Sequence, residues 1–356
     1  MRLRALMTTI LVVTAMTACQ KDQPEISQYR DIVVTSDLSI GRVLFYDKNI
    51  SVNNTISCAS CHKQEFAFAD NVSLSKGFDN QLTLRNSIAI QNINGSSNFP
   101  FLPPSAANSL FWDGRENNIT EMMLQPIVNH REMGILDLEA LCKRLEGLDY
   151  YQELFLRDYG RTTISPMDIA TELEGFVVSI RTNSKFDRSV NLSQPLSTIE
   201  QQGRTLFFEK YDCSACHQEQ NPGGGYHGST DPVAALGFAN IGLDVVEKDK
   251  GLGAVSGRPE DNGKFRIPPL RNVALTAPYM HDGRFKTLDE VMGHYSHGIA
   301  NHKNLDHRLK NDNGNPEVFN ISDSEKHALI AFLNTMTDFE MTTREDLSDP
   351  FIIRDL

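Results

Sequence analysis

Two Cys-x-x-Cys-His pentapeptides constrain this chain more than any other feature: CASCH at 58–62 and CSACH at 213–217. Such a motif is typical of covalent haem attachment, because its thiols can form thioethers to the porphyrin and its histidine can ligate the iron. Two copies predict two haem c groups, and hence electron transfer or haem redox catalysis. The predicted attachment and ligand residues are Cys58, Cys61, His62, Cys213, Cys216 and His217.

A zinc half-site, a redox dithiol and a disulfide are the other uses of a Cys-x-x-Cys pair. Zinc sites usually combine two such pairs, or one pair with two histidines, close together in the sequence. Neither motif has a second ligand pair nearby. A thioredoxin-like dithiol would not require a histidine after both pairs, so haem attachment is favoured.

The first residues predict export. Charged Arg2 and Arg4 precede an apolar run from Ala5 to Ala18, which is too short to span a membrane comfortably. Small residues directly before Cys19 resemble a bacterial lipoprotein signal, cleaved before that cysteine and lipidated on it. An ordinary secretory signal is the alternative. Both predict a periplasmic protein, and lipidation would anchor it to a membrane.

Length, charge and cysteine count narrow the class of protein. A chain of 356 residues is long enough for two domains. A net charge of −12 argues against nucleic-acid binding and suits a basic electron-donor protein. Of six cysteines, only Cys142 has neither a motif nor a lipid role, so we expect it to be a buried free thiol on a helix.

The order helix, motif, long loop, closing helix occurs twice. Helices are predicted from Ser36 to near Phe45 and over 200–208, each before a motif. Closing helices are predicted to start at Ser165 and at Ser322, each with an apolar stripe behind it. Strand signals are sparse, so the predicted fold is mainly α, with two cytochrome c-like domains that each bind one haem c. The predicted divisions are a signal peptide at 1–18, a tether at 19–30, an N-terminal domain at 31–194 and a C-terminal domain at 195–345.

Several ordered blocks accompany the motifs: LRN at 84–86, LFWDGR at 110–115, EMG at 132–134, FRIPPLRNV at 265–273 and TAPYMHDGR at 276–284. With these blocks the chain resembles the bacterial dihaem cytochrome c peroxidases, including the relative that matures tryptophan tryptophylquinone. The resemblance covers nearly the whole mature chain.

The resemblance implies that the first haem is the peroxidatic one. Many members block its distal side with a histidine from the following loop, but no histidine lies between His62 and His130 here. We therefore expect an open distal position, unless His130 or another residue supplies a ligand. Glu132 falls where the family places its acid–base glutamate, whose work is to move a proton between the peroxide oxygens. Met122 stands where many members have a distal glutamine.

The resemblance also implies an electron-receiving role for the second haem. Its distal ligand is expected to be Tyr295, with Met292 as the alternative and Met280 and His294 as weaker candidates. Trp112, the only tryptophan, would lie between the haems and assist electron transfer.

Asn86, Thr276 and Pro278 match the family's calcium site, and calcium prefers such oxygen ligands. By contrast, His294, His297, His302 and His307 cluster in the sequence without paired helical spacing. For these four we expect a solvated loop, not a metal site.

The sequence therefore predicts an exported peroxidase that reduces hydrogen peroxide to water with electrons from a small protein, a monohaem cytochrome c or a cupredoxin. Its cofactors would be two haem c groups and one Ca²⁺. A dihaem oxidase that modifies a partner protein and a non-catalytic electron carrier remain alternatives. Dimers are common in the family, so a homodimer is one expected state.

Overall fold

The computed structural model describes residues 30–93, 109–190, 193–217 and 237–353. The predicted signal peptide, most of the tether and Cys19 lie outside these residues. Within them, no helix combines the length and the apolarity that a membrane span needs.

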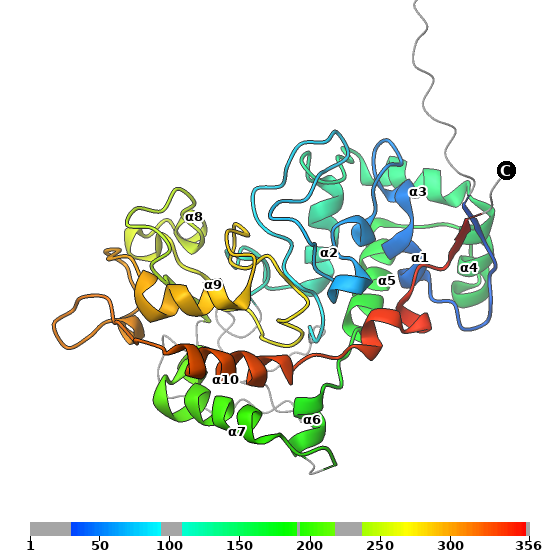
Figure 1. The fold of residues 1–356 in the computed structure, drawn as a ribbon. Coiled ribbons are helices and arrows are strands. Elements are labelled where there is room, and N and C mark those ends of the chain that lie inside the picture. Colours follow the sequence, from blue (N-terminus) through cyan, green and yellow to red (C-terminus); the bar gives the residue numbers. More distant parts are fainter. Residues whose placement is uncertain (1–29, 94–108, 191–192, 218–236, 354–356) are drawn as a thin grey trace, which may run out of the picture.

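The fold is mainly helical, as predicted (Figure 1). The helices are α1 (Ile40–Tyr46), α2 (Ile119–Val128), α3 (Leu138–Glu146), α4 (Asp149–Tyr159), α5 (Pro166–Ser179), α6 (Lys185–Val190), α7 (Thr198–Thr205), α8 (Leu252–Ser256), α9 (Leu288–Gly293) and α10 (Asp323–Asn334). The strands are β1 (Arg30–Ile32), β2 (Phe238–Ala239), β3 (Phe265–Arg266) and β4 (Phe351–Ile353). They form two antiparallel pairs, β1 with β4 and β2 with β3.

The first hydrophobic core is built around α1 and α5. Helix α5 begins where the sequence predicts, with Ser165 and Asp168 forming a capping box and Pro166 at its first turn. Its predicted apolar face is buried: Ile169, Leu173, Phe176, Val177 and Ile180. Helix α1 starts later than predicted, because Ser39 rather than Ser36 caps it by accepting from the Arg42 amide.

The second core is built around α7 and α10, which lie side by side (Figure 1). A Cβ on Gly203 would stand 1.9 Å from the Ala328 carbonyl oxygen, so only glycine permits this close approach of the two helices. Phe332 packs on Phe207, with ring centroids 5.4 Å apart. Helix α7 then continues into a π-helical turn over Leu206–Lys210, directly before the second motif.

The segment after α10 leaves the second core and returns to the first. Met341, Leu347 and Phe351 pack in the first core, and β4 pairs with β1. The Gln64 amide donates to the Met341 and Arg344 carbonyls, both at 2.9 Å. The predicted C-terminal domain, 195–345, includes Met341, whose side chain belongs instead to the first core. The domain boundaries otherwise stay a prediction.

Helix α3 carries the lone cysteine. Cys142 is a free thiol, fully buried in the first core, as the sequence predicts. Burial raises its pKa to about 11, so the thiol stays protonated at neutral pH.

We expect Glu325→Gln to destabilise the protein by about 1 kcal/mol at pH 7, the usual value of a helix N-cap interaction. Glu325 accepts bonds from Lys210, Tyr211 and Ser322, which joins the start of α10 to the turn before the second motif. The hydrogen bond from Lys210 is the largest cause, and the bonds from Ser322 the next, of a fall in the pKa of Glu325 to about 2. This stabilisation is complete above the unfolded pKa of 4.5 and is lost as pH falls toward 2.

Denaturant unfolding at pH 7 and at about pH 3 would measure that change. The difference in unfolding free energy between wild type and variant should shrink at the lower pH, whereas an equal difference at both pH values would contradict the assignment. Glu340→Gln, at an exposed carboxylate, is the matched control and should change little.

Candidate active site

The first motif sits on a tight turn that aims its histidine. Cys58–Ser60 form a short 3-10 turn, and the His62 Nδ1 atom lies 3.0 Å from the Phe68 carbonyl oxygen. Ala67 and Phe68 both have positive φ, at 54° and 57°, a strained backbone for residues other than glycine. The strain turns the Phe68 carbonyl toward His62, and this bond leaves Nε2 free to ligate a metal.

The histidine of the second motif is oriented by the same kind of hydrogen bond, but to a carbonyl far away in the sequence. The His217 Nδ1 atom lies 3.2 Å from the carbonyl oxygen of Pro268, which follows β3. Burial lowers the pKa of His217 to about 4 and also lowers the pKa of His62. Both imidazoles are therefore neutral at pH 7, which is the form that binds iron.

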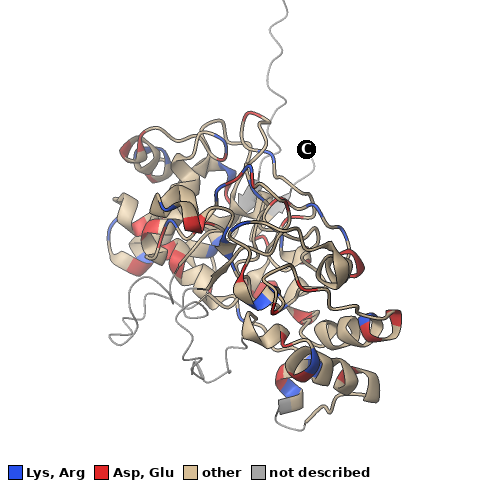
Figure 2. Ribbon diagram, turned by 90° about the vertical axis from the view of Figure 1, so that its left-hand side faces the viewer, with Lys and Arg blue, Asp and Glu red and all other residues tan. Residues whose placement is uncertain are grey.

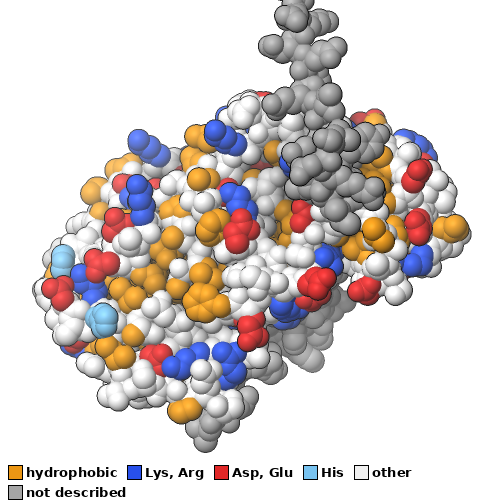
Figure 3. Space-filling model, turned by 45° about the vertical axis from the view of Figure 1, so that its right-hand side comes forward, with side chains coloured by type: hydrophobic (Ala, Val, Ile, Leu, Met, Phe, Trp, Pro, Cys, Tyr) orange, Lys and Arg blue, Asp and Glu red, His pale blue; other side chains and the backbone are white. Residues whose placement is uncertain are grey.

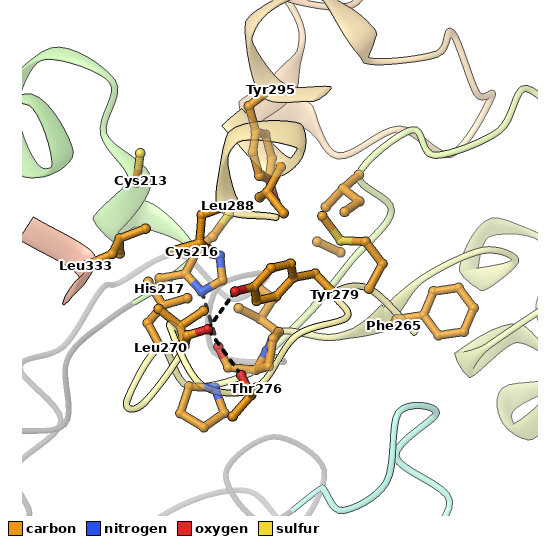
Figure 4. Close-up of a pocket in the computed structure, with 18 of the residues that line it drawn as sticks. Cys213, Cys216, His217, Phe265, Leu270, Thr276, Tyr279, Leu288, Tyr295 and Leu333 are labelled. Carbon is orange, nitrogen blue, oxygen red and sulfur yellow. Dashed lines mark hydrogen bonds between the residues drawn. The ribbon is translucent and has the colours of Figure 1, made fainter. Parts of the chain in front are cut away.

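A large, mostly apolar cavity opens at the second motif (Figure 4). Cys213, Cys216 and His217 contribute to one part of its wall, and Tyr295 reaches it from the π-helical turn over His294–Gly298. Apolar walls, two thiols and an imidazole with an oriented Nε2 are the surroundings that a covalently bound haem requires. These residues therefore fit haem c.

The Tyr295 hydroxyl is the uncommitted phenol of this cavity. The other two lining tyrosines have partners: Tyr279 donates to the Val273 carbonyl at 2.9 Å, and Tyr211 donates to Glu325 at 3.0 Å. No described residue partners the Tyr295 hydroxyl, and burial raises the pKa of Tyr295 well above its ordinary value. Met292 also lines the cavity, one helical turn earlier. The structure thus brings both expected distal candidates to one wall.

The structure treats the two weaker candidates for the distal ligand, Met280 and His294, differently. Met280 lines the same cavity, whereas the His294 Nε2 atom lies 3.0 Å from the Ile241 carbonyl and is committed there. His294 and His302 are buried, and His302 pairs with Asn240, so the expected solvated loop is wrong for both. His297 and His307 are exposed, as expected, but they lie in short helical turns and not in a loop. No group of three or more metal-binding side chains occurs in the described ranges.

Glu132 lies beside the first motif, although 70 residues separate it from His62 in the sequence. Burial raises the pKa of both Cys58 and Cys61, and the negative charge of Glu132 adds to the rise, so the carboxylate lies within electrostatic range of the two thiols. Burial raises the pKa of Glu132 itself, and Arg115 and the Asn129 amide, 2.7 Å away, oppose the shift. A carboxyl group of this kind can both accept and release a proton.

The loop after the first motif is fastened to the turn that carries Glu132. The Phe78 amide donates to the Glu132 carbonyl at 2.9 Å. Gly77 lies against the backbone of Arg131, and Gly134 at φ 72° accommodates the Phe78 ring. His130, the residue that could have supplied a distal ligand, is exposed. The open distal position stays a prediction.

Trp112 connects the two halves of the molecule. Its indole N–H donates to the Asn86 carbonyl at 2.8 Å, and its own carbonyl accepts from the Arg266 amide at 2.8 Å. Trp112 lines the cavity of the second motif together with Ala69, the neighbour of Phe68. The backbone that orients His62 therefore reaches the wall of the second site.

A charge cluster crosses the same junction. Arg85 contacts Asp113 at 2.6 Å and pairs with both oxygens of Asp249, at 2.7 and 2.9 Å. Asp113 also pairs with Arg115 at 3.0 Å. Because Arg115 acts on Glu132, the cluster links the junction between the halves to the first site.

The three predicted calcium ligands lie in one region. Asn86, Thr276 and Pro278 all line the cavity of the second motif. The Asn86 amide nitrogen donates to the Val72 and Ser73 carbonyls, at 3.2 and 3.3 Å, which leaves its Oδ1 as an available acceptor. These oxygen donors match the chemistry of calcium, although no carboxylate joins them.

Sequence reasoning missed two residues of the sites. Asn129 stands three residues before Glu132, and its spacing in a turn is a weak signal that could have found it. Arg308 lines the second cavity and donates to the Ala215 carbonyl within the motif, at 2.8 Å. A lone arginine in a polar loop carries no signal in sequence for this role.

A mainly helical protein with two haem-attachment motifs in separate cores has the build of a dihaem c-type cytochrome. A family model described as di-haem cytochrome c peroxidase matches residues 35–194. The cytochrome c551 peroxidase of Nitrosomonas europaea is 30% identical over 259 residues, covering 71% of this chain and 70% of the relative. The methylamine utilization protein MauG of Paracoccus denitrificans is 28% identical over 354 residues. That match covers 84% of this chain and 88% of the relative.

A crystal structure of a MauG-like protein associated with microbial copper homeostasis superposes with a TM-score of 0.73 and 30% identity. The match covers 94% of this chain and 99% of that one. The chain belongs to the di-haem cytochrome c peroxidase family. It is accordingly an oxidoreductase of the peroxidase type with haem c as its cofactor.

We expect Gly77→Ala to lower peroxidase activity while both haems stay attached. The added Cβ would meet the Arg131 carbonyl oxygen at 1.9 Å, which forces the loop away from the turn of Glu132. Such overpacking should cost about 1–3 kcal/mol of stability. Gly175, exposed in α5 with no atom within 4 Å of the place that a Cβ would take, is the control.

Gly175→Ala should instead raise stability by about 0.5–1 kcal/mol, because alanine favours the helix. Thermal unfolding, haem absorbance and turnover with peroxide measure both variants. Unchanged turnover in Gly77→Ala would show that the loop does not hold Glu132 in place.

Proposed function

We propose that this protein reduces hydrogen peroxide to water at the first motif, with electrons that arrive through the second. The observation that carries the proposal is Glu132, whose backbone carbonyl accepts from the Phe78 amide of the loop after the first motif at 2.9 Å and whose carboxyl pKa is raised by burial. A non-catalytic electron carrier has no use for a half-buried acid–base group near a haem-attachment site. Steady-state assays with peroxide and reduced cytochrome c test the function directly.

Haem c bound at the first motif supplies the iron at which peroxide is held and reduced. The protein supplies the proton movements. Glu132 takes a proton from one peroxide oxygen and delivers it to the other, which can then leave as water when the O–O bond breaks. Asn129 orients the carboxylate through its 2.7 Å bond, and the positive charge of Arg115 limits the rise of its pKa.

The junction between the halves supports electron transfer from the second site to the first. Trp112 touches the Asn86 carbonyl and the cavity wall, and Ala69 carries the backbone that orients His62 to that same wall. The small residues Ser87 and Ala89 line the wall there as well. We propose that Trp112 lies on the electron path.

The surface suits a small protein donor. Acidic and basic side chains are interspersed along the ribbon, and the acidic ones dominate by number, giving the net charge of −12 (Figure 2). Figure 3 shows a face on which apolar side chains lie among scattered charges, the mixture that transient contacts between proteins use. We propose a monohaem cytochrome c or a cupredoxin as the donor.

We further propose two cytochrome c-like domains near 31–194 and 195–345, periplasmic localisation with a lipid anchor on Cys19, and a Ca²⁺ ion held by Asn86, Thr276 and Pro278. The two hydrophobic cores support the domains. The oxygen donors of the Asn86 region support the ion.

A second candidate is an oxidase that modifies a partner protein. Tyr295 favours it, because a phenolate ligand stabilises the ferric state and lowers the haem potential. Relatives named methylamine utilization protein MauG are as similar to the chain as those named peroxidase. Product analysis after peroxide treatment with candidate proteins would separate this activity from oxidation of a small donor.

Glu132→Gln should leave both haems attached and lower turnover by about 10²–10⁴-fold, the usual contribution of a positioned acid–base group. The proton-accepting form is the carboxylate, so wild-type activity should fall at low pH with an apparent pKa above 4.5. The variant should lack this acidic limb. Glu139→Gln, at an exposed glutamate of α3, is the control. Full activity in Glu132→Gln would refute the role.

Tyr295→Phe should change the absorption spectrum of the second haem and raise its reduction potential, because a phenolate ligand is lost. Met292→Leu should leave both properties unchanged. The reverse pattern, in which a methionine-to-iron band near the red edge of the spectrum disappears in Met292→Leu, would decide for methionine.

Removal of calcium with a selective chelator should lower peroxidase activity, and added Ca²⁺ should restore it. Mg²⁺ should not, because it demands a tighter octahedral geometry than backbone carbonyls and an amide provide. Activity that is indifferent to chelation would exclude a functional calcium site at Asn86.

A further inference from the structure

Two adjacent tyrosines of the first core, against which Cys58 also packs, take no part in the proton chemistry of Glu132. Tyr150 and Tyr151 lie in the first turn of α4, with ring centroids 4.7 Å apart and an angle of 44° between the rings. Tyr151 is fully buried in the first core, whereas Tyr150 is half-buried. The pair therefore forms a short aromatic path from the core toward the surface.

Tyr151 is the inner member of the pair. It belongs to the core cluster against which Cys58 of the first motif packs. The pKa of Tyr151 is raised well above its ordinary value, mainly by burial and next by the negative charge of Asp47. Its buried hydroxyl lies near the Asp47 carboxylate, which helps to raise the pKa of Tyr151, but it makes no hydrogen bond of ordinary geometry to a described residue. Tyr151 therefore offers its ring, and its hydroxyl is less well placed than that of Tyr150 to pass a proton to Asp47.

Tyr150 differs from Tyr151 because its hydroxyl is hydrogen-bonded to a proton acceptor. Its hydroxyl donates to Asp47 Oδ2 at 2.7 Å. Asp47 is 3% exposed, and its Oδ1 is held by the Asn49 amide and side chain at 2.8 and 2.9 Å. A phenol that loses an electron becomes strongly acidic, so an adjacent, fixed carboxylate makes that loss easier.

We propose that Tyr150 is a redox-active residue that gives one electron to the peroxide-oxidised first site when no donor protein is bound. The inference rests on the proposed peroxidase function. Tyr150 is oxidised to a neutral phenoxyl radical, and its proton passes to Asp47, which becomes a carboxylic acid. The electron crosses the ring of Tyr151 and is one of the two that convert hydrogen peroxide to water. A later electron from the donor, with the proton from Asp47, restores the phenol.

The test uses the protein with both haems attached, treated with one equivalent of hydrogen peroxide and a nitroso spin trap, without reductant. Proteolysis and mass spectrometry then locate the trap on the chain. We expect an adduct on Tyr150 in the wild type and its loss in Tyr150→Phe. Asp47→Asn keeps the phenol but removes the base, and it should also abolish the adduct.

Two matched controls remove one phenol each. Tyr151→Phe keeps the bridging ring, so the adduct on Tyr150 should persist. Tyr159 is also hydrogen-bonded to a carboxylate, Glu172 at 2.5 Å, but it lies nine residues along α4, roughly 13 Å away at 1.5 Å per residue. Tyr159→Phe should leave the adduct on Tyr150 unchanged.

The proposal is overturned if wild type carries no adduct on Tyr150, if Asp47→Asn retains it, or if either control loses it. Turnover with reduced cytochrome c distinguishes failure of the redox role of Tyr150 from failure of the proposed peroxidase function. Wild type that consumes peroxide with the donor but gives no adduct on Tyr150 refutes the tyrosine alone. Wild type that consumes no peroxide under any condition refutes the proposed function.

Discussion

The hydrogen bond between each motif histidine and a backbone carbonyl is the interaction on which both sites depend. It fixes the ring and the tautomer, so that Nε2 faces the place of the iron. At the first motif the partner, Phe68, is six residues away, and two strained residues aim its carbonyl. At the second motif the partner, Pro268, is 51 residues away. The first site is thus oriented by its own loop, and the second by a separate segment.

The two sites differ in the residues that surround this histidine–carbonyl hydrogen bond. Near the first lies Glu132, a group that can move protons, with Asn129 and Arg115 setting its state. Near the second lies Tyr295, a phenol without a partner in the described part of the chain, on the wall of an apolar cavity. A group suited to proton chemistry therefore lies near one motif, and a candidate iron ligand lies near the other. Trp112 and Ala69 lie where the two meet.

Features written in local sequence were predictable. The two motifs, the start of α5 at Ser165 and the start of α10 at Ser322 each depend on a few neighbouring residues, and all are found where expected. Contacts between distant segments were not. Neither the carbonyl of Pro268 nor the return of Met341 to the first core has a local signal. A family resemblance placed Glu132, but no spacing rule could bring it to Cys58 across 74 residues.

The return of the C-terminal segment gives the molecule an order of assembly. A ribosome releases the first motif long before Met341, Arg344 and β4 are made, yet Gln64, two residues after His62, is held by those late carbonyls. The loop that orients His62 is therefore finished only after the whole second core has been synthesised. Damage at the far end of the polypeptide should be felt at the early site, because in three dimensions the two are neighbours.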